Sequence, residues 1–252
     1  MWEFRFYPAA AVLAVLAFGA AAETIDPARE YSSCLAMANT SPQEAFDRAQ
    51  RWEGLGGGEA ARHCAAAALF GLGKYAEAGK RLEALAQESR REVPVRAGML
   101  RQAGRAWFMA HETDRAYAVQ SAALKLAPGD PQLLVDRAAT LAEGKDYRES
   151  IADLDLALKA EPERPDALLF RASAYRLAGE TASAQRDIDR LLRLNPGNVD
   201  GLLERGILAR LAGHADAARR DWMRILFLDP PSPAADAARR NIERMDVAGA
   251  GE

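Results

Sequence analysis

Cys34, His63 and Cys64 are the residues of this chain whose types most readily suggest chemistry. Thiolates and imidazoles are the ligands that structural zinc sites use, and His63 directly precedes Cys64. Such sites normally hold four ligands at short characteristic spacings, and these three residues match none of those spacings. We therefore expect no metal site, and the two cysteines remain available for another role.

A glycine-rich stretch, EGLGGGE at residues 53–59, is the next candidate. A phosphate-binding loop would need a preceding strand and, in the Walker type, a following Gly-Lys-Ser/Thr. Neither is present, so this stretch is predicted to be a turn between helices. No serine stands in a nucleophile-elbow setting, and carboxylates such as Asp153 and Asp155 belong to a solvated helix. The sequence thus predicts no catalytic residues and no cofactor.

The composition narrows the class of protein further. Of the 252 residues, 49% are hydrophobic and only 7% aromatic, and the apolar content is mostly alanine and leucine, which favour helices. The sequence lacks the alternating β-branched or aromatic runs that are typical of strands. The formal net charge is -3 and no basic stripe is present, so we expect no nucleic-acid partner.

The sequence repeats with a period of 34 residues, and this repeat predicts the helices that would carry any binding residues. Within each period, two helical patterns of about 14 residues flank a turn. Small residues recur at the midpoints of both helices, and a proline recurs near the end of each unit. The recurring positions are Pro128, Pro162, Pro196 and Pro230; Leu100, Leu134, Leu168 and Leu202; Gly104, Ala138, Ala172 and Gly206; and Ala116, Ser150, Ala184 and Ala218. Because so small a helix pair cannot bury its apolar face alone, the units must stack into a solenoid.

These positions resemble the pattern of the tetratricopeptide repeat family, although the family's early tryptophan is leucine here. The resemblance covers residues 97–230 as four units, and a weaker form of it covers residues 23–93 as two degenerate hairpins. Residues 233–246 are predicted to form a capping helix, whose outer face must be polar, and residues 247–252 a disordered tail. The predicted fold is therefore all-α, a solenoid of about six helix-turn-helix hairpins with a C-terminal cap.

Three arginines also recur at this period, and each has an aspartate at the facing position of its own hairpin. The arginines could form a ladder for an acidic ligand, or each could form an ion pair with its aspartate. The unit that has Ala103 in place of the arginine also has Val119 in place of the aspartate. This joint loss favours ion pairs within the hairpins. The predicted pairs are Arg137–Asp153, Arg171–Asp187 and Arg205–Asp221.

The family resemblance implies a concave groove that binds peptides, lined by the first-helix residues beside the packing stripe. Here that groove would be apolar in its middle, with arginines along it. Such a surface suits a partner segment that is acidic or ends in a free carboxylate. The alternative is that the same side chains pack against the first helix of the next unit. The predicted groove residues are Arg101, Arg105, Phe108, Leu169, Phe170, Arg176, Leu203, Ile207 and Arg210.

The N-terminal segment has the pattern of a secretory signal. Arg5 precedes an apolar run from Pro8 to Phe18, and small residues up to Ala22 give an Ala-x-Ala end. The run is too short to span a bilayer comfortably. We therefore predict a signal peptide over residues 1–22, cleaved near Ala22, and a periplasmic or secreted protein without a stable membrane span. The alternative is that the segment is kept as an anchor.

Export would place the two cysteines in an oxidising compartment. Cys34 falls in the middle of the first helix of the first predicted hairpin, and Cys64 near the middle of the first helix of the next. Neighbouring first helices in such an array pack about 8–10 Å apart. A Cys34–Cys64 disulfide is therefore predicted. If the protein is cytoplasmic, the alternative to a disulfide is expected: two free buried thiols that act as small apolar residues.

The predicted function is that of a non-enzymatic interaction module that binds a protein or peptide segment in its groove. The alternative is a self-assembling structural scaffold without a peptide ligand. An enzyme would need a site outside the repeats, and no sequence remains to house one.

Overall fold

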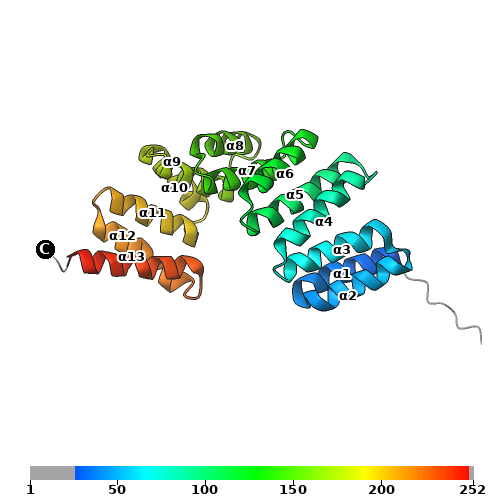
Figure 1. Ribbon diagram of the computed structural model, residues 1–252. Helices are drawn as coiled ribbons and strands as arrows, with labels where there is room; N and C mark the ends of the chain where they lie inside the picture. The colour runs from blue at the N-terminus through cyan, green and yellow to red at the C-terminus, as the bar shows by residue number, and fades with distance from the viewer. Residues whose placement is uncertain (1–25, 250–252) are drawn as a thin grey trace, which may run out of the picture.

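The computed structural model describes residues 26–249, and within this range it contains helices and no strand. The helices form six hairpins followed by a single helix, α13 (Figure 1). Their bounds are α1 Pro27–Thr40, α2 Pro42–Trp52, α3 Gly58–Gly71, α4 Tyr75–Glu88, α5 Val93–Met109, α6 Thr113–Leu126, α7 Pro131–Glu143, α8 Tyr147–Ala160, α9 Pro165–Leu177, α10 Thr181–Leu194, α11 Val199–Leu211, α12 Ala215–Leu228 and α13 Pro233–Gly249, with a π-helical turn, Glu53–Gly57, between α2 and α3. The predicted all-α solenoid of about six hairpins with a cap is confirmed.

The hairpins from α3–α4 onward turn at a residue in the left-handed backbone region. These residues are Gly73, His111, Lys145, Gly179 and Gly213, with φ between 59° and 85°. Glycine adopts this conformation without a steric penalty, whereas His111 and Lys145 adopt it as side-chain-bearing residues. The last four turn residues are 34 positions apart, but Gly73 precedes His111 by 38. The array therefore contains four residues more than the repeat requires.

The four additional residues lie at the start of α5. This helix has 17 residues, compared with 13 in each of α7, α9 and α11, so it is longer by about one turn. We expected the regular units to begin at residue 97, and the helix instead begins at Val93. The Arg96 Nε donates a hydrogen bond of 3.1 Å to the carbonyl oxygen of Ala86, which ties the extra turn to α4.

Small residues at the helix midpoints allow the two helices of a hairpin to approach closely. Gly206 of α11 faces Trp222 of α12, and a Cβ atom at position 206 would lie 2.3 Å from the indole Nε1. In the α7–α8 hairpin the Ser150 hydroxyl donates a hydrogen bond of 2.8 Å to the carbonyl oxygen of Ala138. The small residues recognised in the repeat pattern are therefore places of close helix contact.

The three predicted arginine–aspartate ion pairs are confirmed. Arg171 donates from Nε and Nη2 to the two carboxylate oxygens of Asp187 at 2.8 and 2.7 Å. Arg137–Asp153 and Arg205–Asp221 have the same bidentate geometry. Arg171 also reaches Asp155 of the preceding hairpin at 2.7 Å, so it joins two neighbouring units.

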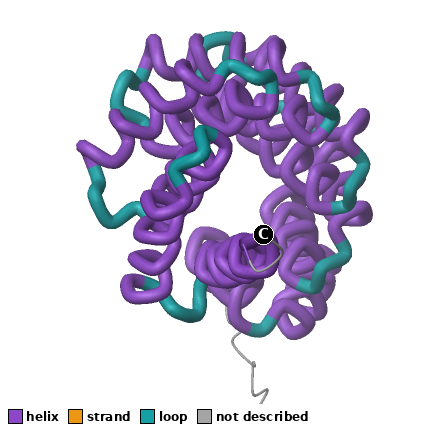
Figure 2. Tube along the Cα trace, turned by 90° about the vertical axis from the view of Figure 1, so that its left-hand side faces the viewer, coloured by secondary structure: helices purple, strands orange, loops and turns teal. Residues whose placement is uncertain are grey.

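The hairpins stack into a curved array. Along most of the array the first helices of neighbouring hairpins lie against one another, and the second helices pack mainly onto first helices. First helices that contact one another lie on the inner side of the curve, and Figure 1 shows this for one hairpin, where α8 lies at the outer rim above α7. Figure 2 shows, from the side, that the chain winds around an open centre. We call the surface formed by the nine predicted groove residues, which lie on α5, α9 and α11, the inner face.

The ends of the chain differ in part from the predictions. The capping helix was expected over residues 233–246, but α13 continues to Gly249, so the first three residues of the predicted tail, 247–252, are helical. Residues 250–252 lie outside the described residues, as does the predicted signal peptide over residues 1–22. Between residues 26 and 249, no helix has both the length and the apolar content that crossing a membrane requires.

Candidate interaction surface on the inner helices

The apolar part of the inner face also supports the core. Phe108, Leu169, Leu203 and Ile207 are half-buried, and each packs against the buried core cluster. Phe170 remains 38% exposed. Each of these side chains presents one side to the core and another to solvent. The same positions therefore provide both packing between units and an exposed apolar surface.

Three of the four predicted groove arginines have no ion-pair partner among residues 26–249. Arg101 is half-buried, and Arg105 and Arg210 are exposed. The Arg105 guanidinium lies over the Phe70 ring of α3, 5.3 Å from its centroid. A cation held over an aromatic face keeps its charge and its donor groups. These arginines are therefore available to an anionic partner.

The fourth predicted groove arginine, Arg176, is engaged within the protein. Its Nε donates to the Glu204 carboxylate of α11 at 2.5 Å, and its Nη2 reaches the other oxygen at 3.4 Å. Glu204 is only 5% exposed. A buried carboxylate needs a compensating charge, so Arg176 links α9 to α11 and is not free to capture a ligand. This corrects its predicted role.

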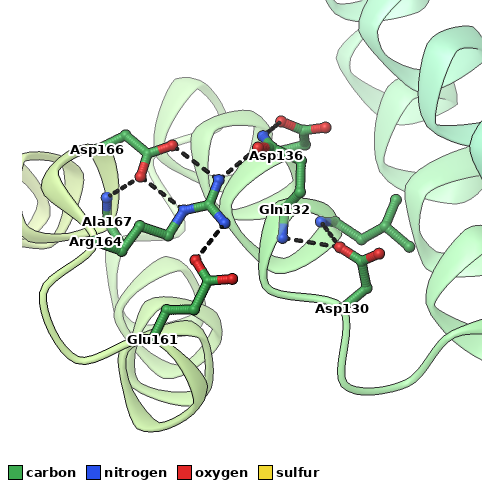
Figure 3. Close-up of polar contacts among 8 residues, drawn as sticks. Asp130, Gln132, Asp136, Glu161, Arg164, Asp166 and Ala167 are labelled. Atoms are coloured by element: carbon green, nitrogen blue, oxygen red, sulfur yellow. Dashed lines mark hydrogen bonds and ion pairs between the residues drawn. The ribbon is translucent and has the colours of Figure 1, made fainter.

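A polar network centred on Arg164 ties the N-terminal ends of α7 and α9 together (Figure 3). The Arg164 guanidinium donates to Asp166 at 2.7 Å, to Glu161 at 2.9 Å and to the Gln132 amide oxygen at 2.5 Å. The Gln132 amide nitrogen donates to Asp136 at 2.8 Å. Every one of these groups has a partner within the protein. We therefore assign the network a structural role, which is to hold neighbouring units at their spacing.

Asp136 lies between this network and the arginines of α5. Burial raises the pKa of its carboxyl group, while the hydrogen bond from Gln132 and the charges of Arg101, Arg105 and Arg164 act to lower it. This one carboxylate faces the positive charges of both α5 arginines. The α5 end of the inner face remains the more basic part.

The two N-terminal hairpins contain a polar contact that the repeat pattern did not indicate. The Tyr31 hydroxyl of α1 and the His63 Nδ1 of α3 share a hydrogen bond of 2.8 Å. His63 is 7% exposed, and burial lowers the pKa of its imidazole. Among residues 26–249, no group of three or more histidine, cysteine, aspartate or glutamate side chains is arranged to hold a metal ion.

Cys34 and Cys64 lie next to this contact. Both are fully buried, their Cα atoms are 6.1 Å apart, and their sulfur atoms are at bonding distance. This separation lies within the range that a disulfide spans. The structure thus supports a cysteine pair that is able to form the predicted disulfide between α1 and α3.

The fold is a helical-repeat solenoid, and its inner face combines apolar side chains with arginines. The family model described as "Tetratricopeptide repeat" matches residues 135–184 and 178–233. The matched residues are therefore tetratricopeptide repeats, and the fold of the described residues agrees with that family. This fold implies a protein–protein interaction module.

Solved structures agree with this assignment. The chain is similar to PilF of Pseudomonas aeruginosa, with a TM-score of 0.63 and 14% identity over 85% of this chain and 99% of that one. A tetratricopeptide repeat protein from Parabacteroides merdae has a TM-score of 0.60 and 18% identity, over 88% of this chain and 75% of that one. MamA from Desulfovibrio magneticus has a TM-score of 0.58 and 18% identity, over 67% and 93%. At these identities the likeness concerns the fold alone. No curated protein sequence matches the chain.

Proposed function

We propose that this protein is an exported, non-enzymatic interaction module that holds an acidic segment of a partner protein along its inner face. The observation that carries the proposal is the arrangement of Arg101, Arg105 and Arg210, which lack ion-pair partners among residues 26–249, around half-exposed apolar side chains. Carboxylates would pair with these guanidinium groups, and apolar residues of the segment would cover Phe170 and its neighbours. The partner would lie in the periplasm or outside the cell.

The test is a crosslinking pull-down from the native envelope fraction. The variant Arg101→Glu/Arg105→Glu should lose the partner, because it replaces two free cations with carboxylates. The matched control, Arg148→Glu/Arg193→Glu, makes the same charge change on exposed residues of the outer helices α8 and α10. Equal capture by both variants would place the binding surface elsewhere.

Export is tested by N-terminal sequencing of the mature protein, which should begin near Glu23. A protein that begins at Met1 in the cytoplasmic fraction would contradict this part of the proposal. The interaction surface would then need a cytoplasmic partner.

A self-assembling scaffold is the second candidate function, and one observation favours it. Phe227 and Met223 of α12 are 84% and 53% exposed, and such apolar exposure often marks a protein interface. Light scattering would then detect oligomers that the variant Phe227→Ser dissociates. A protein that stays monomeric at all concentrations would exclude the scaffold and leave peptide binding as the remaining candidate function.

A further inference from the structure

A pocket of about 340 Å³ opens between the first helices of the first three hairpins, α1, α3 and α5. The buried imidazole of His63, the half-buried phenol of Tyr31 and the carboxylate of Glu59 supply polar groups. Val95 and Met99 of α5 supply apolar surface, and the exposed Arg91 adds a positive charge. Ligand pockets of about 300–1,000 Å³ are typically apolar with a few convergent polar groups, and this pocket is of that kind.

One of the four additional residues of the array, Val95, lines this pocket. Val95 belongs to the extra turn of α5, and Arg91 belongs to the loop directly before it. A hairpin array with regular spacing does not need the extra turn that carries Val95. The pocket is therefore a local addition to the repeat and does not recur with it.

Two links join α1 to α3, which form two of the three walls of the pocket. The Tyr31–His63 hydrogen bond joins α1 to α3 inside the pocket, and the Cys34–Cys64 pair joins the same two helices one turn further along α1. A site whose walls are already positioned loses less conformational entropy when a ligand binds.

The helix α5, which forms one wall of the pocket, also carries the basic part of the inner face. From Met99 to Arg105 the helix α5 rises about 9 Å, which an extended peptide covers with about three residues. Arg101 lies between them, and neither arginine has an ion-pair partner among the described residues. An apolar side chain in the pocket and acidic residues within three positions of it would therefore be accommodated together.

We infer that this pocket receives one apolar side chain of the acidic partner segment and so sets the position of that segment along α5. This inference rests on the proposed function, because the segment's carboxylates are assigned to Arg101 and Arg105. The His63 and Tyr31 side chains would contact the main chain beside the inserted residue.

The experiment measures fluorescence anisotropy with two labelled nine-residue peptides made of glutamate and serine. One peptide has a central phenylalanine and the other a central alanine. The full chain should bind the phenylalanine peptide at least about ten-fold more tightly, because the pocket removes the ring from water. Ala28→Trp, which fills the pocket from α1, should abolish this preference. Ala36→Trp, an exposed position on the same helix outside the pocket, should retain it.

The outcomes separate the two proposals. Arg101→Glu/Arg105→Glu should weaken both peptides and keep the preference for phenylalanine. Equal binding of the two peptides by the unmodified chain, or a preference that survives Ala28→Trp, would overturn the pocket assignment and leave the proposed function intact. Binding of neither peptide would overturn both. Oligomers that form without peptide and are blocked by Ala28→Trp would assign the pocket to a second copy of the chain.

Discussion

The Arg176 guanidinium of α9 pairs with the buried Glu204 carboxylate of α11, with 2.5 Å between Nε and the nearer oxygen. Arg176→Glu would place two carboxylates together in a poorly solvated position. We expect this variant to lower the free energy of unfolding by about 3–5 kcal/mol. The exchanged pair Arg176→Glu/Glu204→Arg should recover much of that loss in thermal unfolding. No recovery, or no initial loss, would show that the contact is unimportant.

The bidentate pair between Arg171 and Asp187 should also contribute to stability. Because both side chains are largely shielded from solvent, a double-mutant cycle to alanine should give a coupling energy of about 1–3 kcal/mol. The exposed pair Arg62–Glu88 serves as the control and should give less than about 1 kcal/mol. Similar coupling in both cycles would contradict the importance of burial.

Two helical glycines should respond to alanine in opposite directions. Gly206→Ala should destabilise the protein by about 1–3 kcal/mol, because the new Cβ would collide with the Trp222 indole. A Cβ atom at Gly98 of α5 would meet no neighbouring side chain or helix within 4 Å, so Gly98→Ala should stabilise the protein by about 0.5–1 kcal/mol. Thermal unfolding of the two variants provides the comparison. Equal effects would contradict the close approach at Gly206.

Mild acid should weaken the N-terminal hairpins through His63. Burial lowers the pKa of this imidazole below its usual 6.5, while Gln102 and Glu59 act in the opposite direction. The unfolded chain therefore binds a proton at a higher pH than the folded chain does. The stabilisation is complete above about pH 6.5 and is lost as the pH falls toward the folded-state pKa.

The melting temperature of the protein should accordingly fall more between pH 7.5 and 5.5 than that of His63→Asn. The comparison with this variant removes other titrations, including that of Asp136, whose raised pKa acts in the opposite sense. Parallel pH profiles for the two proteins would show that His63 does not contribute.

The cysteine pair should be oxidised in exported protein. Intact-mass measurement after alkylation should find no modified thiol until a reductant is added. Because the pair closes a loop with a sequence separation of 30, Cys34→Ala/Cys64→Ala should cost about 2–4 kcal/mol in the stability of the first two hairpins. Two alkylated thiols in unreduced, natively exported protein would contradict the disulfide.

The sequence was sufficient for features that repeat and insufficient for features that occur once. The arginine–aspartate pairs could be predicted because Ala103 and Val119 replace both partners in the same unit. The partner of Arg176 could not be predicted, since the equivalents of Glu204 in the neighbouring units include Phe170 and Asp136. An ion pair that forms in one unit leaves no internal pattern to compare.

The Tyr31–His63 contact was missed for a related physical reason. It joins the two hairpins in which the period is weakest, so the repeat gave no register for aligning α1 with α3. The disulfide could still be proposed, because only two cysteines are present and both fall near the middle of a first helix. The start of α5 was placed four residues late because a regular period was assumed at its boundary.

The additional turn Val93–Arg96 has a consequence for protein engineering. Consensus design of a repeat protein averages the units and deletes residues that interrupt the period, and it commonly raises stability. Applied to this chain, such idealisation would remove Val95 and restore a uniform spacing of 34. The product would be a more regular solenoid that lacks part of the α5 wall of its N-terminal pocket, so the irregular residues are the ones to retain.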